Sequence, residues 1–153
     1  MAAPVSFPVS FKLTLVTPER KILAGQEVEE VFIPAYLGEM NVLPGHAPLM
    51  TTLATGVLRY RIKGEAQLHP VSVSGGYCQV NPEGVNVLAE TAERPEDIDV
   101  ERAKNSLATA QERLSAADIG VDLLEKYQGK IARSVVRQQV AAQTPSPSLG
   151  MSH

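Results

Sequence analysis

The stretch that decides the fold is Gly38-Glu39-Met40-Asn41-Val42-Leu43-Pro44-Gly45-His46-Ala47-Pro48-Leu49. Because Pro44 fixes φ and has no N–H to donate to a neighbouring strand, we expect a strand to end here or to reach the edge of its sheet. Gly45 can adopt a positive φ at little steric cost, and Pro48 keeps Ala47 out of the helical region. The stretch therefore predicts a strand followed by a rigid loop that carries His46, and rigid loops on sheet scaffolds often make contacts.

Strand-like segments lie on both sides of this loop, and helix-like sequence appears only much later in the chain. Residues 11–15 alternate between apolar and polar, which is the period of a half-buried strand. Gly25 is expected to close one short strand, and Pro34 another. The expected strands include residues 11–15, 21–24, 28–33, 49–53, 57–62, 67–73, 77–80 and 85–89. So many short strands with regular turn signals between them predict a β-sandwich or a barrel.

The spacing of the apolar residues changes after Pro95. They now recur 3 or 4 residues apart, which predicts a helix with a narrow apolar seam. Asp97 or Asp99 can cap the start of this helix. The seam consists of Val100, Ala103, Leu107, Ala110 and Leu114.

A break at residues 118–120 precedes a second helix, which should begin near Leu123. Asp122 and Glu125 have the spacing of a capping box at its start. Its apolar face is expected to hold Leu124, Ile131 and Val135. The short link predicts an antiparallel helical hairpin. Because its apolar content is thin, the hairpin should be marginal alone and should lean on the sandwich or on another protein.

The second helix also carries basic residues along one face, roughly opposite its apolar face. They are spaced 4, 3 and 4 residues apart, and we call them the basic stripe: Lys126, Lys130, Arg133 and Arg137. Such a stripe can be a solvated surface. It can also meet an acidic partner or a phosphate-bearing ligand.

Composition sets outer bounds on the class of protein. The chain has 153 residues, 44% of them hydrophobic, with a formal net charge of −3. This length suits one domain plus a small appendage, and the charge does not predict nucleic-acid binding. The single cysteine, Cys78, excludes an internal disulfide and a cysteine-only zinc site, and we expect it to pack in a strand. No apolar run approaches the roughly 18 residues of a membrane span, and residues 1–10 resemble neither a secretory signal nor a transit peptide.

Three stretches, followed by the two-helix tail, resemble a known family. They are Gly38 to Leu49, Val73-Ser74-Gly75-Gly76-Tyr77 and Val87-Leu88-Ala89-Glu90-Thr91-Ala92. Over about residues 9–142 the chain resembles the epsilon subunit of bacterial F-type ATP synthase, which is homologous to chloroplast epsilon and mitochondrial delta. The resemblance implies a ten-stranded β-sandwich followed by a helical hairpin. We expect the sandwich at 1–93, the hairpin at 94–143 and a disordered, Pro- and Ser-rich tail at 144–153.

The resemblance also implies a function. An epsilon subunit is a non-catalytic part of the central rotor stalk, bound to the gamma subunit and the c-ring, and it couples them to the catalytic head during proton-driven ATP synthesis. It would be peripheral at the cytoplasmic face of the bacterial inner membrane, although a chloroplast source stays open. Its hairpin either lies on the sandwich or extends along gamma toward the alpha and beta subunits, where the basic stripe would inhibit ATP hydrolysis.

Two sets of candidate residues follow from this resemblance. Glu39 and His46 fall at positions that face the c-ring in the family, and from the sequence alone His46 is expected to make a loop hydrogen bond or a partner contact. Ile98-Asp99-Val100-Glu101-Arg102-Ala103 matches a pattern that helps to hold ATP in some epsilon subunits, which add arginines four residues apart. The candidate ATP residues are therefore Asp99, Arg102, Arg133 and Arg137.

Physical chemistry allows this ATP site without requiring it. An aspartate could accept from the adenine amino group or the ribose, and arginines could bind phosphates through two hydrogen bonds each. Asp99 would serve equally well as a plain helix cap. We therefore expect ATP binding to be weak or absent, and no cofactor to be required.

No catalytic or metal site is expected from the sequence. It shows no acid pair, nucleophile–base set, metal cluster or phosphate-binding loop, and Ser74-Gly75-Gly76 lacks the pattern of a nucleophile elbow. The alternative to a stalk subunit is a free-standing β-sandwich that binds a ligand or a protein, or a small enzyme, because fold alone decides no function. Co-purification with a membrane ATPase would discriminate between these classes.

Overall fold

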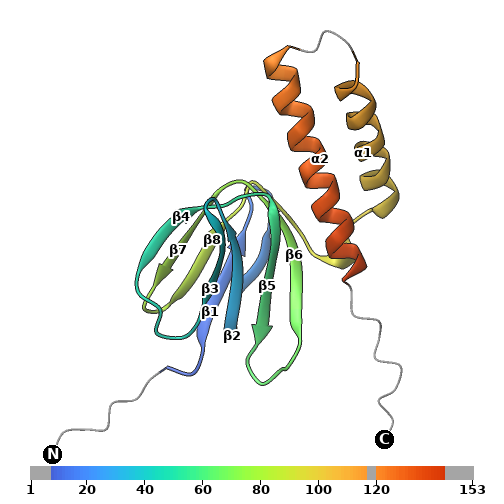
Figure 1. Cartoon of the computed structure of the whole chain (residues 1–153). Coiled ribbons are helices and arrows are strands. Elements are labelled where there is room, and N and C mark those ends of the chain that lie inside the picture. Colours follow the sequence, from blue (N-terminus) through green and yellow to red (C-terminus); the bar gives the residue numbers. More distant parts are fainter. Residues whose placement is uncertain (1–7, 117–119, 144–153) are drawn as a thin grey trace, which may run out of the picture.

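The computed structural model describes residues 8–116 and 120–143, so the expected tail at 144–153 lies outside the described residues. Within them, nine strands precede a helical hairpin (Figure 1). The strands are β1 (Phe11–Val16), β2 (Lys21–Ala35), β3 (Gly38–Val42), β4 (Leu49–Thr52), β5 (Gly56–Ile62), β6 (Leu68–Ser74), β7 (Tyr77–Asn81), β8 (Gly84–Leu88) and β9 (Thr91–Glu93). The 3-10 helix η1 (Pro95–Asp97) then leads to α1 (Val100–Leu114) and α2 (Val121–Ala142). No helix in the described ranges is long and apolar enough to cross a membrane.

The strands form one sheet that folds over into a sandwich, which confirms the predicted fold class. The strand order is β4-β7-β8-β1-β2-β5-β6-β9, with β3 also paired to β2. The first half of β2 pairs with β1, and its second half pairs with β3 and β5, so this long strand links the two halves of the sheet. Alternate residues point inward, and Leu13, Val31, Ile33, Leu58 and Val87 are fully buried.

The separate strands expected at 21–24 and 28–33 are one strand in the structure. Gly25 has a φ of +68° and lies where β2 contributes an extra residue to its pairing with β1. The chain therefore bulges at Gly25 instead of ending there. The Gly25 N–H donates to Thr14 Oγ1 at 3.1 Å, which holds the bulge. This continuous β2 accounts for finding nine strands in the described residues where the family resemblance implied ten.

The loop after β3 has the rigid form that the sequence predicts. β3 ends at Val42, and the His46 N–H donates to the Leu43 carbonyl at 3.1 Å across Pro44 and Gly45. Gly45 has a φ of +82°, as the third residue of a type II turn requires. The predicted strand end and turn are confirmed.

The two helices pack against each other as an antiparallel hairpin (Figure 1). Asp99 caps α1, because its carboxylate accepts a hydrogen bond from the Arg102 N–H at 3.0 Å. The sequence had offered either Asp97 or Asp99 as the cap, and the structure selects Asp99. The seam of α1 is buried only at Ala103 and Ala110, whose small side chains let the helices approach closely. The capping box predicted for α2 is wrong: the helix begins one residue after Gly120, and no side chain caps it.

The second helix also buries a different face from the one expected. Leu124 and Val135 are each 37% exposed, whereas Val136 and Val140 are buried. Those two valines cluster with Ile98, and the C-terminal half of α2 thereby rests on β5, β6 and η1 at one end of the sandwich (Figure 1). The spacing of apolar residues in the sequence favoured the face with Leu124, Ile131 and Val135. In the structure, the end of the sandwich packs against Val136 and Val140 instead.

Candidate functional site

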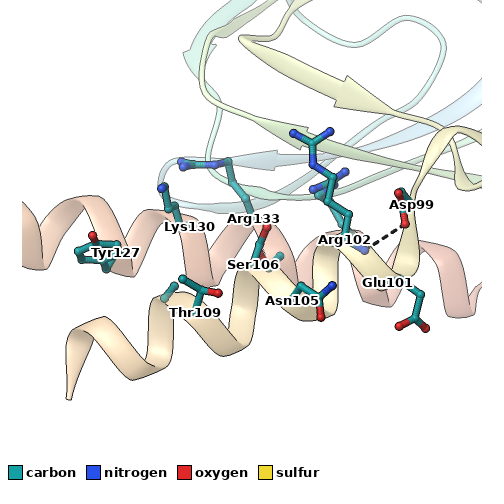
Figure 2. Close-up of a pocket in the computed structure, with 12 residues that line it drawn as sticks. Asp99, Glu101, Arg102, Asn105, Ser106, Thr109, Tyr127, Lys130 and Arg133 are labelled. Atoms are coloured by element: carbon teal, nitrogen blue, oxygen red, sulfur yellow. Dashed lines mark hydrogen bonds between the residues drawn. The ribbon is translucent and has the colours of Figure 1, made fainter. Parts of the chain in front are cut away.

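A groove of about 670 Å³ lies between α1 and α2 on the side of the hairpin that faces the sandwich (Figure 2). Its walls include all four residues that the sequence nominated for ATP binding, together with Tyr127 and Lys130. The four nominated residues are Asp99, Arg102, Arg133 and Arg137. The antiparallel hairpin thus brings the start of α1 beside the second half of α2.

The groove is basic on one side. Arg102, Lys130 and Arg133 point to the same side of the two helices, whereas Glu101 points away from them (Figure 2). Within residues 8–116 and 120–143, the guanidinium groups of Arg102 and Arg133 have neither an ion pair nor a hydrogen bond. Cationic groups without an anionic partner attract anions, so the groove can receive a phosphate or a carboxylate.

Asp99 and Arg137 already have partners inside the protein. The Asp99 carboxylate is occupied as the cap of α1. Arg137 Nη2 donates to Glu93 Oε2 at 3.2 Å, and Arg137 Nε lies 2.7 Å from Glu93 Oε1 in an electrostatic contact that lacks hydrogen-bond alignment. A ligand that used all four candidate residues would have to separate Arg137 from Glu93.

A smaller cavity of about 130 Å³ adjoins the groove, since Arg133 and Arg137 line both. Its floor carries hydroxyl groups from the sandwich, and Thr55 Oγ1 and Ser74 Oγ lie 2.8 Å apart there. Together with Glu93, these groups form the polar part of the joint between the hairpin and the sandwich.

The basic stripe is divided between solvent and this joint. Lys126 and Lys130 are exposed, and their ammonium groups lie 6.0 and 5.6 Å from the ring centroid of Tyr127. Arg133 is half-buried, and Arg137 is held by Glu93. The stripe is therefore not a free solvated face along its whole length in this conformation.

Glu39 lies at the start of β3, whereas His46 lies in the loop that follows the end of this strand at Val42, so the structure does not bring them into one site. Glu39 Oε2 accepts from Arg59 Nη2 at 2.9 Å, and the Arg59 guanidinium lies 4.7 Å from the ring centroid of Phe32. His46 Nδ1 lies 2.9 Å from the Ala47 carbonyl, which is a loop hydrogen bond of the kind expected.

The described residues offer little reactive chemistry. No group of three or more His, Cys, Asp or Glu residues could hold a metal ion in the described part of the chain. Burial raises the pKa of the Cys78 thiol to about 12, so at neutral pH it stays protonated and unreactive. Burial also raises the pKa of Tyr60, which lies in the sandwich and lines neither the groove nor the smaller cavity.

Comparison with known proteins decides the family. The model of the ATP synthase delta/epsilon chain, β-sandwich domain, matches residues 10–95. The ATP synthase epsilon chain of Bdellovibrio bacteriovorus is 45% identical over 138 residues, which cover 90% of this chain and 99% of that one. The chain belongs to the ATP synthase delta/epsilon family. The expected resemblance is confirmed, and the alternative of a sandwich module unrelated to ATP synthase is wrong.

Further relatives of this family member agree with the assignment. The ATP synthase epsilon chain of Geotalea uraniireducens is 42% identical over 131 residues, which cover 86% of this chain and 93% of that one. A chain in the mitochondrial ATP synthase of Euglena gracilis, solved with OSCP, F1 and the c-ring, has a TM-score of 0.73 at 28% identity. That match covers 92% of this chain and 85% of the Euglena chain, so it includes both the sandwich and the hairpin.

Two residues that contribute to the sites of this delta/epsilon chain, Glu93 and Arg59, were not predicted from the sequence. Glu93 lies at the end of β9 and meets α2 only through the tertiary fold, 44 residues away in sequence. Arg59 lies 20 residues from Glu39 and reaches it because β2 pairs with both β3 and β5. Neither residue belongs to a recognisable sequence motif. Only a correct prediction of the strand order would have placed them beside Arg137 and Glu39.

Proposed function

We propose that this chain is a non-catalytic subunit of the central stalk of a rotary F-type ATP synthase, bound to the gamma subunit and the c-ring. The observation that carries this proposal is the 45% identity with an epsilon chain along 99% of its length. The shared sandwich and hairpin support it. In this role the chain transmits rotation between the ring and the catalytic head, and its place is peripheral, at the cytoplasmic face of a bacterial inner membrane.

Glu39 and His46 are proposed as contacts with the c-ring. Both lie next to turns of the sandwich and are exposed or half-buried in the isolated chain, so a partner can reach them. Arg59 holds the Glu39 carboxylate in an ion pair, and its guanidinium is itself stacked on the ring of Phe32. A carboxylate that is already fixed loses little side-chain entropy when a partner binds it.

The experiment that tests this function combines Glu39→Lys with His46→Trp. We expect the double variant to fold normally and to bind gamma. It should lower the rate of proton-driven ATP synthesis in the reconstituted complex about tenfold, because it puts a second positive charge beside Arg59 and a bulky ring at the proposed contact. Glu112→Lys on α1 is the matched charge reversal away from the sandwich and should leave synthesis unchanged. Wild-type synthesis by the double variant would contradict the contact.

Inhibition of ATP hydrolysis is proposed to require release of the hairpin. In the conformation described, Arg137 is bound to Glu93 and Arg133 is half-buried, so only Lys126 and Lys130 are fully available to a partner. Leaving the sandwich would free both arginines and present the whole basic stripe to acidic segments of the catalytic subunits. Several charges together are needed for an appreciable effect, because single exposed ion pairs are weak.

ATP binding to the groove is proposed to be weak. Arg102 and Arg133 support an anion there, but Asp99 is a helix cap and Arg137 has an internal partner. Calorimetric titration of the isolated chain with MgATP should give a Kd no tighter than about 1 mM, and Arg133→Gln should weaken whatever binding is seen. A micromolar Kd would contradict this interpretation.

A further inference from the structure

A hollow of about 310 Å³, which we call the ring hollow, lies between β5, β6 and the segment that leads into the hairpin. Within it the rings of Tyr60 and His69 stack with their centroids 5.3 Å apart, and Pro70 and Pro95 add two further rings to its walls. Its volume is at the lower end of the range for ligand pockets, which are lined mainly by apolar and aromatic side chains. The ring hollow can therefore receive a short apolar segment.

The ring hollow lies beside an incompletely paired edge of the sheet. Strand β9 pairs with β6 only from Ser72 to Ser74. Residues 68–71 of β6 therefore have β5 on one side and, among the described residues, no strand on the other. Pro70 lies in this stretch and has no N–H to donate, which is typical of an edge. A chain segment that is not a strand can thus lie along this edge without competing with β9.

His69 forms a fixed wall of the ring hollow. Its Nε2 lies 2.7 Å from Glu65 Oε2, and its ring makes an angle of 24° with the ring of Tyr60. The side chain of His69 is 31% exposed, whereas Tyr60 is buried. A ring that is held from two sides loses little side-chain entropy when a partner packs on it.

The charges around the ring hollow favour an uncharged occupant. Arg94 and Glu96 line it with opposite charges, and Glu65 already has His69 as its partner. Arg94 Nη2 also donates to the Ile22 carbonyl. No excess of one sign is therefore offered to an ionic ligand, and apolar contact has to supply most of the binding.

The chain that follows α2 begins close to the ring hollow. α2 packs on η1, and Val140 near its end clusters with Ile98, which directly follows η1 (Figure 1). Pro95 and Glu96 of η1 in turn line the ring hollow. α2 ends at Ala142, and five extended residues after 143 can span up to about 17 Å. Residues 144–149 are therefore within reach of the ring hollow.

The sequence of this segment suits a site lined by rings. It reads Thr144-Pro145-Ser146-Pro147-Ser148-Leu149, and residues 144–153 contain no Asp, Glu, Lys or Arg. Grooves lined by aromatic rings commonly recognise proline-rich segments, because a polyproline II segment is already extended and loses little entropy on binding.

We propose that residues 144–149 bind in the ring hollow and thereby fasten the end of α2 to the sandwich. The joint cluster of Ile98, Val136 and Val140 is small, so a contact beyond the end of α2 adds appreciably to the attachment of the hairpin. The tail then favours the attached hairpin over the released one. Only the effect of this preference on ATP hydrolysis rests on the proposed function.

The test places a nitroxide spin label on the tail of the full-length chain through Ser148→Cys. The native Cys78 is fully buried and does not take up the label. In the proton NMR spectrum we expect the label to abolish the ring signals of His69. The ring signals of His46, which lies in the loop after β3 and lines a different hollow, should remain.

The contribution of the two prolines is measured in the same labelled chain. Pro145→Ala combined with Pro147→Ala should restore the His69 signals, whereas the matched control, Thr144→Ala combined with Ser146→Ala, should not. Amide hydrogen exchange at the end of α2 should become about threefold faster in the proline double variant and stay unchanged in the control.

Three results would overturn the inference. The first is an equal loss of His69 signals with and without the two prolines, which would show a tail that is only tethered nearby. The second is a loss of His69 signals in an unlabelled chain mixed with a labelled one, which would make the occupant the tail of another copy. The third is unchanged exchange in α2 of the proline double variant. These measurements use the isolated chain, so a failure of the proposed stalk function is distinguishable from all three.

Discussion

At the scale of single residues, the buried thiol of Cys78 makes stability depend on pH. Burial raises its pKa from 9.0 to about 12, so the folded chain retains a proton that the unfolded chain loses above about pH 9. The contribution of this thiol to stability is therefore complete below pH 9 and falls as the pH rises toward 12. We measure the free energy of unfolding with denaturant at several pH values in this window. For wild type it should fall by up to about 1.4 kcal/mol per pH unit more than for the Cys78→Ala variant. Parallel declines would contradict the burial argument.

A second prediction at this scale concerns Gly76, at the corner between β6 and β7. Its φ is +95°, and a Cβ placed there would lie 1.8 Å from the Leu88 carbonyl oxygen. We expect Gly76→Ala to destabilise the chain by about 3 kcal/mol or more, because both the backbone angle and the contact oppose it. Gly64→Ala is the control: Gly64 has a φ of +85° but nothing within 4 Å. It should cost only the backbone strain, about 1–2 kcal/mol, so equal losses would count against the contact.

At the scale of secondary-structure elements, one ion pair ties α2 to the sandwich. Arg137 and Glu93 are 20% and 26% exposed, and the apolar contact beside them is small. Removing the charge with Arg137→Met should lower the free energy of hairpin opening by about 1 kcal/mol. Amide hydrogen exchange near the end of α2 should then become roughly fivefold faster.

Lys126→Met provides the control for that measurement. Lys126 belongs to the same basic stripe but is exposed and has no ion pair among the described residues. Its removal should leave exchange in α2 unchanged. Combining Arg137→Met with Glu93→Gln should add little further opening, since the two residues act as one pair. Independent, additive effects of the two substitutions would show that the pair does not hold the helix.

The elements also show which parts of the structure the sequence can specify. Turn chemistry placed the loop after β3 correctly, because Pro44 and Gly45 restrict the local backbone whatever surrounds them. Gly25 was misjudged because a glycine can end a strand or bulge it, and only the partner strand decides. The buried face of α2 could not be predicted either, since it depends on where the end of the sheet meets the helix.

Similar limits apply to the candidate sites. The family resemblance at Asp99 and Arg102, together with the spacing of Arg133 and Arg137, nominated four residues that line one groove in the structure, and their binding of ATP stays a prediction. The partner that occupies Arg137 was invisible, because Glu93 reaches it through a long-range contact. Local patterns thus nominated the cationic groups, but only the fold shows which of them are free.

At the scale of the whole molecule, the chain divides into a closed sandwich and a lightly attached hairpin (Figure 1). The sandwich buries its own extensive core, whereas Ile98, Val136 and Val140 form the small cluster at the joint. A joint of this size allows attached and released states that differ by only a few kcal/mol, so conditions in the complex can select between them. The sandwich would then serve as the fixed rotor part, and the hairpin as its movable regulator.

The most direct test of the central claim is proton-driven ATP synthesis by membranes whose own epsilon subunit has been removed. Adding the full-length chain should restore synthesis at least about tenfold above the depleted level. A chain that ends at Glu93 should restore it as well, since it keeps β1 to β9 together with Glu39 and His46, the proposed contacts with the c-ring. If a folded full-length chain leaves synthesis at the depleted level, it is not the stalk subunit that we propose.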